Sequence, residues 1–404
     1  MTPPSRSPRI VWDGGLPYST QFDDLYHSRS GGLSEARAVF LAGCGLPEAW
    51  AGKDAFFVGE LGFGTALNVA ALLDLWRRTR PAGARLHIFS VEAFPLAPSD
   101  ARRALAAWPE VGDPAAALLS RWPRRASGFH RVALDAFGAV LDVAVMDVEE
   151  ALDGWTGFAD AWFLDGFAPS HNPAMWTDRV LDAVARRSRE GARLATFTVA
   201  GAVRRGLEAH GFAVERKPGF GAKRERLEGT LARPAAPRPR PRAAGAAIVG
   251  AGIAGAALAR ALHALGVDPL VIEADAAGAG ASGNPAALVM PRLDAGAGPV
   301  GALYAQALAR AADMLDETAG AIIARGVRQL AVGPKDAGRF DRIATSPLFE
   351  PGAVERLGAA ALSASLGEPV HVGGLFLRDA RVIEPAVVLA DWLAGASPLD
   401  RVHA

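Results

Sequence analysis

The strongest constraint on the fold of this chain is a glycine motif, GAGIAG, at residues 250–255. A short apolar run, 246–249, precedes the motif, and a helical pattern follows it over 256–265. A second apolar run, 268–272, then ends in Glu273. The succession of strand, glycine turn, helix, strand and acid is that of a nucleotide-binding β-α-β unit. The sequence therefore predicts a Rossmann-type domain that begins close to residue 245.

The same motif predicts the kind of ligand. Its glycines allow a tight turn, close approach of the backbone to a pyrophosphate, and packing of the helix on the strand. Glu273 can accept hydrogen bonds from the adenosine ribose, and no Lys or Arg follows it directly, which disfavours a 2′-phosphate and leaves FAD or NAD. A loop rich in glycine and serine at 278–294 favours FAD. The predicted FAD-binding residues are Gly250, Gly252, Gly255, Glu273, Ser282, Gly283 and Asn284.

A second glycine turn lies in the first half of the chain. Residues 56–60 read as a buried strand, and the turn at 61–65 opens a helix over 66–76. A further strand, 86–92, ends in Glu92, at the spacing from the turn at which a carboxylate takes ribose hydroxyls. Gly62 and Gly64 form a wider turn than GxGxxG. Such a turn suits the ribose and amino-acid portion of S-adenosylmethionine better than a pyrophosphate.

An abrupt change from apolar to polar residues singles out Asp165. The apolar run 161–164 reads as a buried strand that delivers this carboxylate to the crevice beyond the strand ends, where ligands bind in open α/β sheets. The proline-containing loop after it carries Phe167 and Trp176. A stiff loop of this kind can position a nucleophile and accept its proton. The alternative is that Asp165 only caps the following helix.

Asp147 is a second candidate at a strand end. Residues 129–134 and 134–147 predict a hairpin around 135–138, and the second strand ends in Asp147. This carboxylate is a candidate partner for an adenine amino group. Alternatively, it caps a helix over 148–152.

The rest of the first half alternates between helices and strands. We expect a helix over 173–189, a strand over 193–198, a helix over 203–210 and a last strand pair around 219–224, which together predict a mainly parallel doubly wound sheet. Basic side chains near its end form either a phosphate-binding patch or a solvated face, namely Arg204, Arg205, Lys223, Arg224 and Arg226.

The clearest boundary is RPAAPRPRPR at 233–242, which is typical of a stiff, polyproline-like linker. We predict a first domain over 1–232, a linker over 233–244 and a second domain over 245–404. After the glycine-rich loop, the second domain reads as helical from residue 303, and 374–383 reads as a strand pair.

Composition and residue spacing exclude several classes of protein and of binding site. The 43 basic and 43 acidic residues cancel, so contact with nucleic acid must come from a local patch. The single cysteine, Cys44, excludes an intramolecular disulfide and fits a reducing compartment, and the eight histidines lack metal-ligand spacing, so we expect no metal. The N-terminus lacks a signal-peptide core, and the apolar stretch 243–259 is short for a membrane span. We expect a cytoplasmic monomer with no membrane association and no stable protein partner.

Several longer strings resemble a known family. They include FDDLYHS at 22–28, ELGFGTALN at 60–68, WFLDGFAPSHNPAMW at 162–176, ATFTVAGAVRRGL at 195–207, GFGAKRE at 219–225 and GASGNP at 280–285. Together with GAGIAG, they resemble the bifunctional tRNA 5-methylaminomethyl-2-thiouridine biosynthesis proteins over nearly the whole chain. The resemblance implies an α/β fold, a class I methyltransferase-like doubly wound sheet, followed by a partial FAD-binding Rossmann-type domain of the amino-acid-oxidase kind.

That resemblance implies two reactions on the wobble uridine of certain tRNAs. The FAD-dependent domain would remove the carboxymethyl group of 5-carboxymethylaminomethyl-(2-thio)uridine and leave the 5-aminomethyl form. The S-adenosylmethionine-dependent domain would then methylate the amine to 5-methylaminomethyl-(2-thio)uridine, with Asp165 as the catalytic residue that orients the amine and helps it lose a proton. By the same resemblance, S-adenosylmethionine is held by Glu60, Gly62, Gly64, Glu92 and Asp147, and the tRNA substrate by Phe167, His171, Trp176, Lys223 and Arg224.

The chain departs from the family pattern at three positions. Ala66 replaces a glycine in the cofactor turn, His171 stands where a lysine is usual, and Ala174 stands where an acid is usual. Three alternative functions remain open. They are methyltransferase activity alone, an amine oxidase and alkyltransferase acting on small molecules, and a tRNA-binding scaffold without catalysis.

Overall fold

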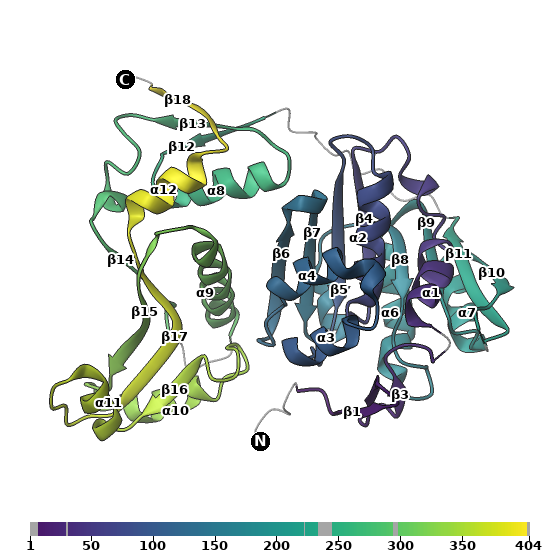
Figure 1. The fold of residues 1–404 in the computed structure, drawn as a ribbon, viewed down its shortest axis with the longest axis horizontal. Coiled ribbons are helices and arrows are strands. Elements are labelled where there is room, and N and C mark those ends of the chain that lie inside the picture. The colour runs from purple at the N-terminus through teal and green to yellow at the C-terminus, as the bar shows by residue number, and fades with distance from the viewer. Residues whose placement is uncertain (1–6, 30, 222, 233–244, 294–297, 402–404) are drawn as a thin grey trace. The chain divides into compact units, whose positions relative to one another are not determined.

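The computed structural model describes residues 7–29, 31–221, 223–232, 245–293 and 298–401 (Figure 1). The chain divides into two compact units, Met1–Pro239 and Arg240–Ala404. The predicted linker, 233–244, lies outside the described residues, so the domain limits stay a prediction. Each unit is described by itself.

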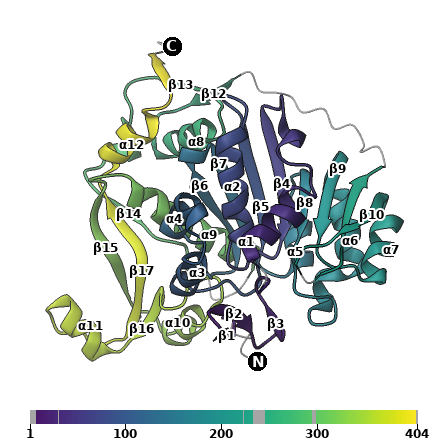
Figure 2. The same ribbon diagram turned by 45° about the vertical axis from the view of Figure 1, so that its right-hand side comes forward.

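An eight-stranded sheet forms the centre of the first unit. Its strands are β4 (Ala55–Leu61), β5 (Arg85–Val91), β6 (Gly128–Leu134), β7 (Ala139–Val145), β8 (Ala159–Leu164), β9 (Ser188–Thr196), β10 (Phe212–Pro218) and β11 (Glu225–Leu231). The order across the sheet is β10-β11-β9-β8-β4-β5-β7-β6, with all eight strands labelled in Figure 1. Figure 2 shows the same sheet turned, with β6 towards one side and β10 at the other. The central pairs are parallel, whereas β6 with β7 and β11 with both of its neighbours are antiparallel. The predicted mainly parallel, doubly wound sheet is confirmed.

Helices cover both faces of this sheet, because its central strands are apolar on both sides. In β5, Leu86 and Ile88 pack into one buried cluster, and Phe89 and Val91 into another. The helices are α1 (Gly32–Glu35), α2 (Leu67–Thr79), α3 (Pro98–Leu105), α4 (Gly112–Ser120), α5 (Val148–Gly154), α6 (Asp178–Arg186) and α7 (Gly201–Ala209). A π-helical turn, η1 (Ala36–Leu41), continues α1, and shorter turns are η2 (Glu48–Trp50), η3 (Pro109–Val111), η4 (Asp135–Phe137) and η5 (Pro173–Trp176).

Local structure corrects one sequence prediction in the first unit. The single helix expected over 173–189 is instead a 3-10 turn, η5, followed by the separate helix α6. Thr177 separates them: its backbone is extended, and its Oγ1 accepts a hydrogen bond from the Val180 amide at 3.2 Å as the N-cap of α6. The predicted hairpin of β6 and β7 is confirmed. A small antiparallel sheet of β1 (Ile10–Asp13), β2 (Leu16–Ser19) and β3 (Asp24–Leu25) was not predicted.

The second unit contains two sheets. The parallel strands β12 (Ala246–Val249), β13 (Pro269–Glu273) and β18 (Ser397–Arg401) form one, and α8 (Ile253–Ala264) connects the first two strands. This confirms the predicted β-α-β unit. The other sheet contains β14 (Ala287–Val289), β15 (Ile322–Leu330), β16 (Val354–Leu357) and β17 (Gly374–Ile383). The remaining helices are η6 (Ala281–Gly283), α9 (Pro299–Glu317), α10 (Asp336–Ala344), α11 (Ala359–Leu366) and α12 (Pro385–Leu393).

Two predictions in the second unit are wrong. Residues 374–383 form one ten-residue strand, β17, rather than a strand pair, and β17 pairs antiparallel with β14, β15 and β16. The region after residue 303 is only partly helical, because β15 interrupts it. In the described ranges, no helix is long and apolar enough to cross a membrane.

Candidate functional site

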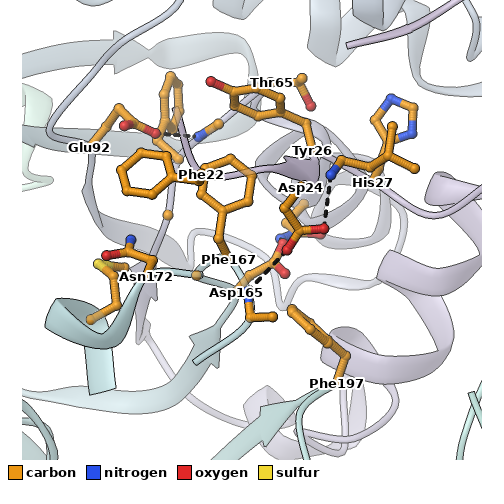
Figure 3. Close-up of a pocket in the computed structure, with 18 of the residues that line it drawn as sticks. Phe22, Asp24, Tyr26, His27, Thr65, Glu92, Asp165, Phe167, Asn172 and Phe197 are labelled. Carbon is orange, nitrogen blue, oxygen red and sulfur yellow. Dashed lines mark hydrogen bonds between the residues drawn. The ribbon is translucent and has the colours of Figure 1, made fainter. Parts of the chain in front are cut away.

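A cavity of about 610 Å³ lies at the carboxyl ends of the central strands of the first unit (Figure 3). Gly62 follows β4, Glu92 follows β5, Met146 follows β7 and Asp165 follows β8, and all four line the cavity. Residues from the segment 21–36 complete its wall. The cavity occupies the crevice in which open α/β sheets bind ligands.

The glycine turn after β4 brings backbone to the edge of this cavity. Gly62 has φ 102°, and a Cβ atom on it would lie 2.4 Å from the carbonyl oxygen of Asp165, so no other residue fits there without displacing the loop after β8. Gly64 is also left-handed, with φ 49°. Ala66 has φ 63°, which is the conformation that a glycine at the same place would adopt freely. The substitution at Ala66 thus keeps the shape of the turn at a cost in backbone strain.

Glu92 is tied to the turn through backbone amides. Its Oε2 accepts from the Gly64 amide at 2.9 Å, and its Oε1 accepts from the Phe94 amide at 2.9 Å. Burial raises the pKa of Glu92, and the two hydrogen bonds oppose that effect. The carboxyl group is therefore fixed beside Gly64 at the predicted ribose position.

Asp165 lies partly buried beside the turn, and one of its oxygens is hydrogen-bonded. The Nδ2 of Asn68 donates to its Oδ2 at 2.7 Å. Burial is the main cause that raises the pKa of Asp165 to about 7; the charges of Glu35 and Asp24 act in the same direction, and the Asn68 hydrogen bond and the Lys223 ammonium oppose the rise. A carboxyl group that titrates near neutrality suits proton transfer. Asp165 does not cap the next α-helix, since Thr177 does so, and the alternative of a capping role is wrong.

Aromatic rings form one wall of the cavity. Phe22 stacks on Phe167 with ring centroids 5.0 Å apart, and Tyr26 meets Phe167 edge-on at 5.2 Å. Figure 3 shows Phe22 and Phe167 side by side. Phe94 meets Phe22 edge-on at 5.8 Å. These rings offer a flat, apolar surface against which a base or another planar group can pack.

The predicted substrate residues divide into two groups. Phe167 and Lys223 line the cavity, and Lys223 pairs with the buried Glu35 at 2.8 Å. His171, Trp176 and Arg224 are not among the lining residues. Trp176 instead donates from Nε1 to the Phe167 carbonyl oxygen at 2.9 Å, so it supports the loop from outside the cavity.

The predicted cofactor residues also divide. Gly62, Gly64, Glu92 and Asp147 line the cavity, whereas Glu60 does not and is only 1% exposed. Asp147 also caps α5, since its Oδ1 accepts from the Glu149 amide at 2.9 Å. The capping role is thus confirmed, and a contact with adenine stays a prediction.

Sequence reasoning missed several polar residues of the cavity. Asn68 lies one residue into α2, and its 2.7 Å contact with Asp165 joins positions 97 residues apart. Asp24 accepts from the Ala168 amide at 3.1 Å and so ties the N-terminal segment to the loop after β8. Tyr26 and Glu35 also line the cavity, and burial raises the pKa of Tyr26. The sequence signals were the strings FDDLYHS, which contains Asp24 and Tyr26, and ELGFGTALN, which ends in Asn68, but neither string gave a role for these residues.

The GAGIAG turn of the second unit has the geometry of a dinucleotide cradle. Gly250 has φ 101°, and a Cβ atom on Gly255 would lie 2.0 Å from the Gly250 carbonyl oxygen. Glu273 accepts from the Ala251 amide at 2.7 Å, and this and other backbone hydrogen bonds lower its pKa. The turn therefore fits the close approach of a pyrophosphate and the acid fits a ribose partner.

The glycine- and serine-rich loop reaches the same turn. Ser282 Oγ accepts from the Ile253 amide, the first residue of α8, at 3.0 Å. A Cβ atom on Gly252 would lie 3.2 Å from that hydroxyl, and one on Gly283 would lie 2.3 Å from the Gly278 carbonyl oxygen. Asn284 Nδ2 donates to the Ala281 carbonyl oxygen at 3.0 Å. The predicted FAD residues of the two segments thus gather at the N-terminus of α8.

Across the described ranges, no cluster of His, Cys, Asp and Glu could hold a metal ion.

Two family models match the chain. Residues 109–232 match the S-adenosyl-L-methionine-dependent methyltransferase model, and residues 246–399 match the FAD dependent oxidoreductase model. The chain is 58% identical over 403 residues to the tRNA 5-methylaminomethyl-2-thiouridine biosynthesis bifunctional protein MnmC of Caulobacter vibrioides. This chain belongs to that bifunctional family.

The alignment covers 99% of this chain and 66% of the Caulobacter vibrioides relative. The relative of the same name in Caulobacter sp. strain K31 is 56% identical, with 97% of this chain and 65% of the relative covered. The chain thus spans about two thirds of the length of these relatives. Among solved structures, MNMC2 from Aquifex aeolicus has a TM-score of 0.45 and 24% identity, over 59% of this chain and 75% of that one.

Proposed function

We propose that the first unit transfers a methyl group from S-adenosylmethionine to the primary amine of 5-aminomethyl-(2-thio)uridine at the wobble position of tRNA. The observation that carries the proposal is the partly buried carboxyl group of Asp165, which has a raised pKa and lies against a glycine turn in an aromatic-lined cavity. The matched methyltransferase model and the names of the relatives support it.

The cavity residues have distinct tasks in this reaction. S-adenosylmethionine, when bound, would supply an electrophilic methyl group on its sulfonium, and its sulfur–methyl bond would break as the new bond forms, with S-adenosylhomocysteine as the leaving group. Gly62, Gly64 and Glu92 would hold the cofactor, and Phe22 and Phe167 would pack against the uracil ring. The ionised carboxylate of Asp165 takes a proton from the substrate ammonium, which frees the nitrogen lone pair that forms the new N–C bond. Holding the amine in line with the methyl group accounts for the remaining rate increase.

For the second unit, we propose FAD binding and oxidation of the C–N bond of the 5-carboxymethylaminomethyl group to an imine, which water hydrolyses to the 5-aminomethyl form with release of the carboxymethyl carbons as glyoxylate. The carrying observation is the turn in which Gly255 approaches the Gly250 carbonyl too closely for any Cβ atom. FAD, when bound, supplies a hydride acceptor. Gly250, Gly252, Gly255 and Ser282 would hold it at the N-terminus of α8. A cytoplasmic location, tRNA as partner and a monomeric state complete the proposal.

Methyl incorporation from labelled S-adenosylmethionine tests the first activity. The full chain is incubated with tRNA that carries 5-aminomethyluridine, with the same tRNA lacking that group, and with free small amines. We expect incorporation only into the first tRNA. Equal rates with free amines would favour the small-molecule alkyltransferase, and no incorporation by a chain that binds the cofactor would favour the scaffold.

Flavin absorbance of the same sample tests FAD binding by the second unit. A colourless protein that takes up no added FAD would leave methyltransferase activity as the only proposed activity.

A further inference from the structure

The side-chain amide of Asn68 lies beside two carboxyl groups, that of the partly buried Asp165 and that of the buried Glu60. Its Nδ2 donates to Asp165 Oδ2 at 2.7 Å, and its side chain also lowers the pKa of Glu60. Asn68 is 8% exposed and follows Leu67, the first residue of α2, directly after the glycine turn. The amide is therefore held by the same turn that shapes the cavity.

Glu60 lies in surroundings that oppose its charge. It is 1% exposed, Ser90 Oγ donates to its Oε2 at 2.5 Å, and its Oε1 is buried with no hydrogen-bond partner in the described part of the chain. Burial is the main cause that raises the pKa of Glu60 to about 8; the charges of Asp165 and Glu92 act in the same direction, and the Ser90 and Asn68 hydrogen bonds oppose the rise. A buried carboxylate without donors on one oxygen is costly, so the neutral acid is favoured.

We propose that Asn68 is the positioning residue of Asp165 and that Glu60 supports it as a neutral carboxylic acid. The inference rests on the proposed methyl transfer. An amide donor on Oδ2 fixes the plane of the Asp165 carboxylate and leaves its other oxygen to face the amine. A neutral Glu60 neither repels Asp165 nor competes with it for the Asn68 donor.

This role differs from the one that the sequence predicted for Glu60. As a cofactor ligand, Glu60 would have to be ionised and to line the cavity, but it does not line it. The two roles give opposite results for Glu60→Gln, because glutamine copies the shape of the neutral acid and removes the charge. If Glu60 is a neutral supporting acid, Glu60→Gln should keep its activity. If Glu60 is an anionic cofactor ligand, the same change should weaken cofactor binding.

The test uses the full chain and tRNA carrying 5-aminomethyluridine. Binding of S-adenosylmethionine is measured by calorimetry, and kcat for methyl transfer is measured as a function of pH. We expect Asn68→Ala to lower kcat by about tenfold or more, with cofactor Kd retained. Asn68→Asp is nearly isosteric and places a second charge beside Asp165. It should move the acidic limb of the pH profile to higher pH.

Glu60→Gln provides the complementary readout. The native rate should decline above about pH 8, where Glu60 ionises, and the variant should keep its rate there and most of it at neutral pH. Native pH profiles in both Asn68 variants would overturn the positioning role. A large rise in cofactor Kd for Glu60→Gln would instead identify a cofactor ligand. A native chain that binds cofactor but transfers no methyl group would contradict the proposed function itself, before any variant is compared.

Discussion

At the residue scale, the chemistry depends on how burial changes the acidity of Asp165. Burial raises its pKa to about 7, so the ionised fraction falls as the pH decreases through that value. We expect kcat/KM for methyl transfer to fall about tenfold per pH unit below the pKa. A pH series with 5-aminomethyluridine tRNA measures the slope. A profile that stays flat down to the pKa of an ordinary carboxyl group would show that Asp165 does not titrate in the reaction.

A second prediction at this scale concerns backbone strain. Ala66 has φ 63° and ψ 19°, where a Cβ atom is unfavourable. Ala66→Gly should therefore stabilise the first unit by about 0.5–1 kcal/mol, less the extra entropy of glycine in the unfolded chain. Ala70→Gly, three residues into the interior of α2, is the matched control and should destabilise it by about 1 kcal/mol or more. Thermal unfolding of the full chain measures the stability of both variants. Equal losses of stability in both would contradict the backbone strain at Ala66.

Some residues of the cavity were predictable from the sequence and others were not. Gly62 and Asp165 were predictable because each follows an apolar run, and strand ends share one edge of a parallel sheet. Asn68 and Glu35 were not predictable, because their partners lie far away in sequence and a polar residue on a helix is usually solvated. Trp176 was expected at the cavity but supports the loop from outside it, because sequence does not distinguish an aromatic residue that lines a cavity from one that packs behind a loop.

At the element scale, the turn after β4 determines whether the cavity exists. A Cβ atom on Gly62 would lie 2.4 Å from the Asp165 carbonyl oxygen, at φ 102°. Gly62→Ala should therefore displace the loop after β8 and abolish methyl transfer and binding of S-adenosylmethionine. Gly83→Ala is the matched control, because Gly83 has φ 73° with nothing within 4 Å of its Cβ position. Calorimetric titration with the cofactor distinguishes them, and unchanged binding by Gly62→Ala would refute the account of the turn.

The predicted helices and strands match the structure where the apolar periodicity and the positions of glycine and proline indicated the same element boundaries. The two glycine turns and their flanking strands were predicted, because apolar runs of strand length end at glycine. The helix over 173–189 was wrong because an N-cap at Thr177 competes with continued helix, and Pro173 opens a separate 3-10 turn. β15 was missed because none of its residues is buried and its burial shows no alternation, so only pairing with β17 identifies it.

At the scale of the whole molecule, the two units repeat one arrangement. In each, the acid at the end of the second strand of a β-α-β segment accepts from an amide of the glycine turn, as Glu92 does from Gly64 and Glu273 does from Ala251. Each unit has its own buried core. Damage to one turn should therefore leave the chemistry of the other unit intact.

Gly255→Ala tests this independence. Its Cβ atom would lie 2.0 Å from the Gly250 carbonyl oxygen, so the variant should lose bound flavin. Methyl transfer to tRNA already carrying 5-aminomethyluridine should remain at the native rate. Gly358→Ala, at a position with open space, is the control and should keep both properties. Parallel loss of flavin and methyl transfer in Gly255→Ala would show that the units act as one.

The central claim is that the carboxylate of Asp165 accepts the proton of the amine. Asparagine has nearly the same shape but cannot take up that proton, so Asp165→Asn isolates this function from packing. The decisive measurement is the rate of methyl transfer to 5-aminomethyluridine tRNA by the native chain and by this variant, with cofactor binding checked in both. We predict a loss of about 10²–10³-fold in kcat with binding retained. A variant that methylates at the native rate would contradict the account.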